Sequence, residues 1–105
     1  MPCFDGFRPS LVLGALVAAT AGAHTPICNC YDNGDDTVTC EGGFSDGASA
    51  EGVAIRVVGP AERVLMQGKM DAAGTFSFAR PEQEFHVVFD AGDNHSVTIF
   101  GDEIE

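Results

Sequence analysis

From residue 24 onward, short hydrophobic runs are separated by turn signals roughly every 8 to 12 residues. Several runs alternate hydrophobic and polar positions, as half-buried strands do, and the 3.6-residue period of an amphipathic helix is largely missing. This spacing predicts an all-β, two-sheet Greek-key sandwich. We expect seven strands, over residues 26–31, 37–44, 53–58, 63–70, 75–78, 84–90 and 95–100.

Glycines between and within these runs carry further signals. The D-x-x-G turn at 71–74 requires a left-handed residue at its last position, so Gly74 is expected there. The pair Gly42-Gly43 inside a strand predicts a β-bulge. After the last strand, residues 101–105 (GDEIE) are expected to form a polar tail.

The first 23 residues differ from the rest of the chain. Residues 11–23 (LVLGALVAATAGA) carry no charge, follow Arg8 and end in the small residues A-G-A. This pattern is typical of a cleaved signal peptide over residues 1–23, with the folded domain over 24–105. An amphipathic or buried N-terminal helix is the alternative. The run is shorter than the roughly 20 residues of a membrane-spanning helix. We therefore expect a periplasmic or secreted mature chain that does not insert into the membrane.

Acidic residues dominate the charge of the chain. The net charge is −11, and loss of Asp5 and Arg8 with the signal peptide leaves it unchanged. Such a chain repels nucleic acid and attracts cations or basic partners. The sequence contains no G-x-S-x-G, H-E-x-x-H or phosphate-binding glycine loop, and no serine or carboxylate pair is singled out by its surroundings. We therefore expect a protein that is not an enzyme.

Cleavage after Ala23 would make His24 the first residue of the mature chain. A terminal histidine presents its α-amine and its imidazole together, and the two nitrogens can chelate one cation. Copper and nickel favour such nitrogen ligands. Alternatively, His24 simply follows the cleavage site and is disordered, like most termini.

Three cysteines, Cys28, Cys30 and Cys40, remain in the mature chain. The first two are two residues apart, so they face the same side of one strand. Cys40 lies on the partner strand, opposite either of them. A cross-strand disulfide with one spare thiol is the favoured interpretation. A thiolate cluster for copper(I), zinc or nickel is the alternative, and a reducible disulfide would allow both.

Two further histidines are candidate ligands. His86 alternates with Phe85 and Val87 along a strand and is expected to be a surface or partly buried residue. His95 follows a turn before the last strand, and loops carry many of the sites on β-sandwiches. His95 is therefore the better candidate of the two.

Four segments resemble the periplasmic accessory domain of nickel and cobalt uptake systems. They are E-G-G-F-S-D-G (41–47), V-A-I-R-V (53–57), G-K-M-D-A-A-G-T-F-S-F (68–78) and H-V-V-F-D-A-G-D-N-H (86–95). The resemblance implies a carboxypeptidase regulatory-like, immunoglobulin-like fold. It also places the leading histidine of that family at His24 and its turn histidine at His95. The Asp93-Asn94 pair and the cysteines depart from the family pattern.

Together, these observations predict a non-enzymatic domain that binds or delivers a metal ion, with nickel, cobalt or copper as the candidates. His24 is the expected main ligand, supported by His95 or by a thiol of Cys28, Cys30 or Cys40. A membrane permease is the partner that the resemblance implies. The alternative is a metal-free structural or interaction module that docks on a transporter or envelope protein.

Overall fold

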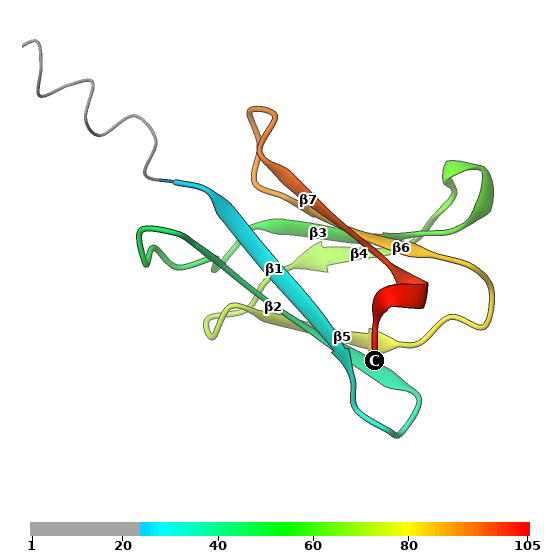
Figure 1. Cartoon of the computed structure of the whole chain (residues 1–105). Helices are drawn as coiled ribbons and strands as arrows, with labels where there is room; N and C mark the ends of the chain where they lie inside the picture. The colour runs from blue at the N-terminus through cyan, green and yellow to red at the C-terminus, as the bar shows by residue number, and fades with distance from the viewer. Residues whose placement is uncertain (1–23) are drawn as a thin grey trace, which may run out of the picture.

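The computed structural model describes residues 24–105, and the expected signal peptide over 1–23 lies outside the described residues. Within residues 24–105, seven strands form two antiparallel sheets (Figure 1). The three-stranded sheet has the order β1 (Pro26–Asp32), β2 (Thr37–Phe44) and β5 (Thr75–Ala79). The four-stranded sheet has the order β4 (Val64–Lys69), β3 (Ala54–Val58), β6 (His86–Asp90) and β7 (Ser96–Phe100). Two 3-10 turns are η2 (Pro60–Glu62) and η3 (Gly101–Glu103).

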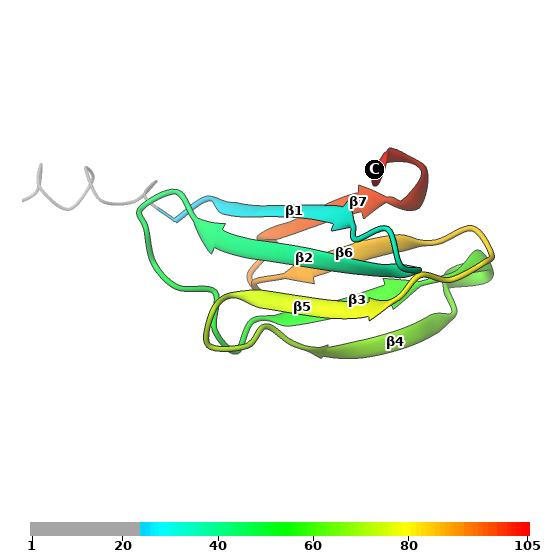
Figure 2. The ribbon, with the colours of Figure 1, turned by 90° about the horizontal axis from the view of Figure 1, so that it is seen from below.

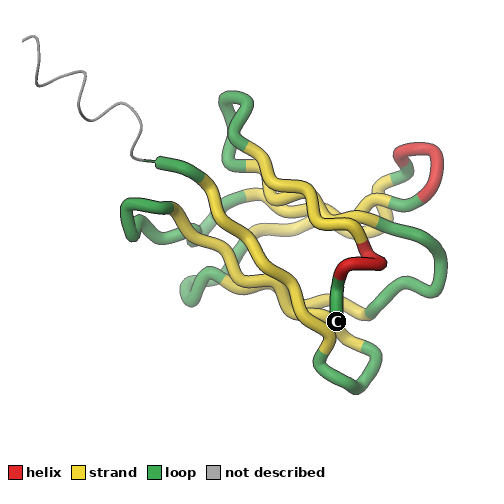
Figure 3. The backbone as a smooth tube through the Cα atoms, in the orientation of Figure 1, coloured by secondary structure: helices red, strands yellow, loops and turns green. Residues whose placement is uncertain are grey.

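The strands of both sheets run along the same long direction of the domain, so their connections gather at two opposite ends (Figures 2 and 3). One end holds the start of β1 and the connections β2–β3, β4–β5 and β6–β7; we call it the histidine end. The opposite end holds the connections β1–β2, β3–β4 and β5–β6 and the C-terminus. Strands β1 and β7 lie next to each other at the edges of the two sheets.

The core lies between the two sheets and follows the alternation of each strand. Its largest fully buried side chains are those of Phe89, Ile55, Val38, Val57, Val87 and Cys40. Phe85, Val87 and Phe89 face inward, as the sequence predicts, because they share one face of the chain through β6. Val88 faces the other way and is nevertheless buried, since β6 is an inner strand flanked by β3 and β7.

The predicted bulge at Gly42-Gly43 is wrong. The register of β1 and β2 is unbroken there, with Ile27 opposite Gly43 and Cys28 opposite Gly42. Gly42 instead allows a close approach between the sheets, because a Cβ at this position would lie 2.6 Å from the Phe89 ring. The register shift in the structure falls in β3, between Val57 and Val58.

All strands except β2 differ from the prediction by one or two residues at an end, and the tail differs as well. Strand β6 begins at His86 and not at residue 84, and β7 begins at Ser96, so His95 belongs to the preceding turn. The C-terminal segment is not a purely polar tail, because it turns through η3 and buries Ile104 in the core. The left-handed conformation expected of Gly74 is confirmed, with φ of 75°.

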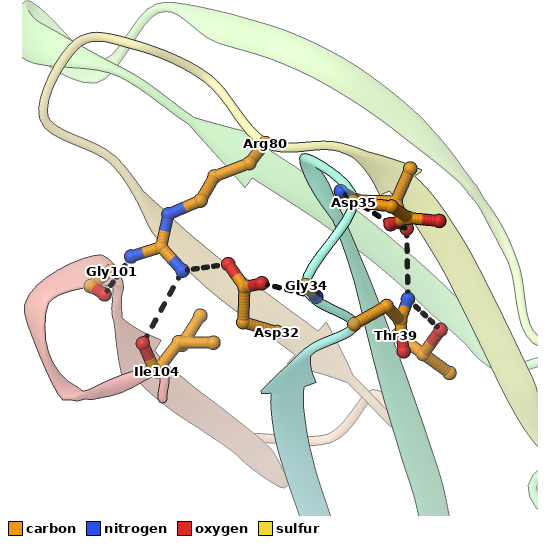
Figure 4. Close-up of polar contacts among 9 residues, drawn as sticks. Asp32, Gly34, Asp35, Thr39, Arg80, Gly101 and Ile104 are labelled. Carbon is orange, nitrogen blue, oxygen red and sulfur yellow. Dashed lines mark hydrogen bonds and ion pairs between the residues drawn. The ribbon is translucent and has the colours of Figure 1, made fainter.

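Arg80 links several segments at the end of the sandwich opposite to the histidine end (Figure 4). Its guanidinium donates to Asp32 Oδ2 at 2.8 Å, to the Gly101 carbonyl at 3.1 Å and to the Ile104 carbonyl at 3.3 Å. It also lies 5.7 Å from the centre of the Phe85 ring. One side chain therefore joins the end of β1, the β5–β6 loop and the C-terminal turn.

The geometry predicts opposite outcomes for two neighbouring glycines. Gly42→Ala forces its new methyl group into Phe89, so we expect the free energy of unfolding to fall by about 1–3 kcal/mol. Gly43→Ala is the matched control, because its Cβ would meet nothing within 4 Å, and we expect a change within about 0.5 kcal/mol. Urea denaturation of both variants measures the difference. Equal effects would contradict the close-approach role of Gly42.

Acid is expected to weaken the fold partly through Asp32. The Gly34 amide and the Arg80 guanidinium both donate to this carboxylate and lower its pKa. A carboxyl whose pKa is lower in the folded state stabilises the protein above its unfolded pKa of about 3.9. That contribution is lost as pH falls from there through the folded pKa. Urea midpoints between pH 5 and pH 2 should fall less steeply for Asp32→Asn than for the native chain, and parallel slopes would contradict this.

Candidate functional site

His24 is paired with an acidic residue of the β2–β3 loop. Its Nδ1 atom lies 2.6 Å from Oδ2 of Asp46. The histidine side chain is 68% exposed, whereas the aspartate side chain is 26% exposed. The first described residue of the chain is therefore held against the domain and remains open to solvent on its other side.

The backbone next to His24 is fixed to the same loop. The Thr25 amide donates to Ser45 Oγ at 3.1 Å, and the Ser45 amide donates back to the Thr25 carbonyl at 2.9 Å. The loop itself is stabilised by a turn in which the Ala48 amide donates to Asp46 Oδ1 at 3.0 Å and Gly47 adopts φ of 86°. One oxygen of Asp46 thus supports the loop, and the other is directed at His24.

This arrangement brings two kinds of metal-ligating atom together. An imidazole nitrogen and a carboxylate oxygen both bind divalent transition metals. Nδ1 of His24 is the ring nitrogen closer to the backbone, so a metal ion bound to Nδ1 and to a free α-amine would close a six-membered ring. Asp46 is not among the site residues predicted from the sequence, although the F-S-D-G segment that carries it contributed to the family resemblance.

The other predicted histidines do not join this pair. His95 lies in the β6–β7 turn at the histidine end, exposed, with its amide donating to the Gly92 carbonyl at 2.7 Å. His86 lies at the start of β6, towards the opposite end, and its ring is 5.9 Å from that of Phe100. Over residues 24–105, no group of three or more histidine, cysteine or acidic side chains is placed to hold a metal ion.

The structure shows which of the cysteines pair, a point that the sequence left open. Cys30 lies opposite Cys40 in the β1–β2 register, and the two form a disulfide. In this oxidised form neither residue offers a thiolate, so metal binding by these sulfurs stays a prediction for the reduced protein. Cys28 is the spare thiol, buried in the core. Burial raises the pKa of its thiol to about 11.

Other carboxylates at the histidine end are committed to the turns. Asp71 accepts from the amides of Ala73 and Thr75 and from the Thr75 hydroxyl, and these bonds lower its pKa. Asp90 accepts from the Gly92 amide and pairs with Arg56 at 3.2 Å, and these contacts also lower its pKa. Both carboxylates stabilise hairpin connections and are poorly placed to be metal ligands.

A hollow in the surface lies elsewhere, at the opposite end of the sandwich. It has a volume of about 620 Å³ and is bounded by the β5–β6 loop and by the C-terminal turn. Its lining includes neither His24 nor Asp46. The candidate metal site is therefore a surface site at the end of a loop and not a cavity.

The fold and this site define an all-β protein of two antiparallel sheets with a disulfide and a surface histidine–aspartate pair. Comparisons with protein-family models, with curated proteins and with solved structures find no significant match to the chain. The resemblance to nickel and cobalt uptake domains thus stays a prediction. In the part of the chain from residue 24 on, no helix has the length and apolar character needed to cross a membrane.

The thiol chemistry of the three cysteines can be tested directly. We expect Cys28 of the folded protein to stay unmodified by iodoacetamide at pH 8, because its thiol is buried and protonated. The same thiol should react fully once the protein is unfolded. Peptide mapping without reduction should recover Cys30 joined to Cys40. Rapid alkylation of Cys28 in the folded state, or a linkage through Cys28, would contradict this assignment.

Proposed function

We propose that this chain is an exported, non-enzymatic domain that binds a transition-metal ion through the terminal histidine of its processed form, His24. Nickel, cobalt and copper are the candidate metals, and binding or delivery of the ion to a membrane permease is the proposed role. Two ligands would be the α-amine and Nδ1 of His24. Asp46 would be a third, because its Oδ2 atom lies 2.6 Å from Nδ1; the metal ion would replace the proton shared by these two atoms, which is released to solvent.

The observation that carries this proposal is the short contact between His24 and Asp46 together with the paired hydrogen bonds of Thr25 and Ser45. A disordered terminus would have to lose its conformational freedom to bind a metal ion, which costs free energy. Here the neighbouring backbone is already ordered. The nitrogen and oxygen donors also match the ligand preferences of divalent nickel, cobalt and copper.

Export is part of the proposal and has separate support. The disulfide between Cys30 and Cys40 is the kind of bond that persists in an oxidising compartment. The signal-peptide pattern in residues 11–23 points to the same compartment. We propose a periplasmic or secreted location on these two grounds.

The finer fold assignment also belongs to this proposal. The strand orders β1-β2-β5 and β4-β3-β6-β7 are compatible with an immunoglobulin-like Greek key, in which β1 of one sheet lies beside β7 of the other. We propose the immunoglobulin-like, carboxypeptidase regulatory-like class on this order.

A second candidate function is a metal-free interaction module that docks on a transporter or envelope protein. The observation that favours it is the hollow at the end opposite to His24, which no part of the metal proposal uses. In that case the disulfide would act as a structural staple of about 2–4 kcal/mol, and His24 would have no ligand role.

Calorimetric titration of the processed protein with nickel, copper and cobalt tests the metal proposal. We expect an added glycine before His24 to weaken binding by about tenfold or more, because it converts the chelating amine into an amide. We expect Asp46→Asn to weaken binding by about tenfold through the loss of a carboxylate beside Nδ1.

Glu51→Gln is the matched control for the carboxylate. It removes the same charge from the same loop, is exposed and has no side-chain contact to His24 among the described residues. We expect it to retain the native affinity. Equal affinity in the native protein and in the glycine-extended variant would overturn the terminal chelate, and equal losses for Asp46→Asn and Glu51→Gln would overturn the role of Asp46.

A further inference from the structure

The hollow at the opposite end of the sandwich is an open groove between two segments that are distant in sequence. The loop 80–85, between β5 and β6, forms one wall, and residues 100–103 at the end of β7 form the other. The Gly101 amide donates to the Phe85 carbonyl at 2.9 Å and holds the two walls together. The groove is thus a fixed feature of the fold and not a gap between loose ends.

Carboxylates line this groove without matching cations. Glu82, Glu84 and Asp102 are exposed, and none of them has an ion-pair or hydrogen-bond partner among residues 24–105. Glu103 accepts from the Phe100 amide through one oxygen. Arg80 is the cation that borders the groove, and Asp32 and two carbonyl groups already occupy its guanidinium. The groove therefore keeps a net negative charge.

An aromatic residue, Phe100, lines the same groove as these carboxylates. The side chain of Phe100 is 54% exposed, the highest value among the exposed large hydrophobic residues described. The neighbouring His86 ring lies on one side of it, with 5.9 Å between the ring centres. An exposed phenyl ring near carboxylates offers a guanidinium both a π face to stack on and an anion to pair with.

The same groove already shows this type of recognition within the chain. The Arg80 guanidinium lies 5.7 Å from the centre of the Phe85 ring, and it donates to a carboxylate and to two carbonyl oxygens around that ring. An aromatic ring, a carboxylate and carbonyl oxygens thus together bind the guanidinium of Arg80, a residue that lines the groove. The lining of the groove contains a second aromatic ring, that of Phe100, and carboxylates that have no partner within residues 24–105.

We propose that this groove is a docking site for an arginine side chain of a partner protein. The guanidinium stacks on the ring of Phe100 and pairs with Glu82, Glu84 or Asp102, while the apolar stem lies along the groove. Arginine fits better than a free polyamine, because its planar group stacks on a ring and binds a carboxylate through two bonds at once. This proposal does not depend on metal binding at His24, which lies at the other end of the domain.

Titration of the ¹⁵N-labelled protein with a hexa-arginine peptide, followed by NMR, tests the proposal. We expect shifts of the amide signals to be largest over residues 82–85 and 100–103. Phe100→Leu keeps the apolar bulk and removes the π face, so the affinity for the peptide should fall about two- to fivefold. Hexa-lysine should bind more weakly than hexa-arginine to the native protein, and equally to native and Phe100→Leu.

Charge-matched variants separate the groove from the general acidity of the domain. The pair Glu82→Gln and Glu84→Gln should weaken hexa-arginine binding more than the pair Glu51→Gln and Asp93→Asn, which removes the same charge at the histidine end. Circular dichroism and urea midpoints verify that each variant is folded. Equal losses for the two pairs, unchanged binding in Phe100→Leu, or equal preference for spermidine and hexa-arginine would overturn the proposal.

Discussion

The contact between Phe89 and the backbone of Gly42 sets the geometry on which the rest of the structure depends. Phe89 is fully buried at the centre of the sandwich, and its ring approaches β2 more closely than any side chain at position 42 would permit. Side chains alternate between the two faces of a strand. A one-residue slip of β2 would therefore turn Gly42 away from Phe89 and turn the core side chains of β2 towards solvent. The contact therefore fixes the register of β2 against the facing sheet.

That register has consequences at both ends of the strand. It places Cys40 opposite Cys30, where the disulfide forms, and Cys28 opposite Gly42, which has no thiol with which Cys28 could pair. It also fixes where β2 ends at Phe44, whose ring lies 6.3 Å from that of Phe89. Ser45 and Asp46 follow at once, so the packing of the core determines where these two residues meet Thr25 and His24.

Strand positions could be predicted from the sequence because each follows from local alternation and from turn residues such as Gly74. Apart from shifts of one or two residues at strand ends, the exceptions are long-range. A glycine within a strand is compatible both with a bulge and with the close approach of a distant side chain. At Gly42 that side chain is Phe89, 47 positions later in the sequence. Ile104 sits among charged residues, and only its return to the facing edge beside β1 makes it part of the core. Asp46 could not be recognised as a partner of His24, since their contact depends on the pairing of β1 with β2.

The contacts of each carboxylate decide whether its charge stabilises the fold or is available to a ligand. Asp32, Asp71 and Asp90 accept backbone amides at the ends of strands, so their charge stabilises turns and is unavailable to a ligand. Asp46 divides its two oxygens between its own loop and His24. The glutamates of the 80–85 loop have no such task. The net charge of −11 is therefore not one uniform surface property, because some carboxylates stabilise turns and others, such as Glu82 and Glu84, remain exposed without a side-chain partner in the described part of the chain.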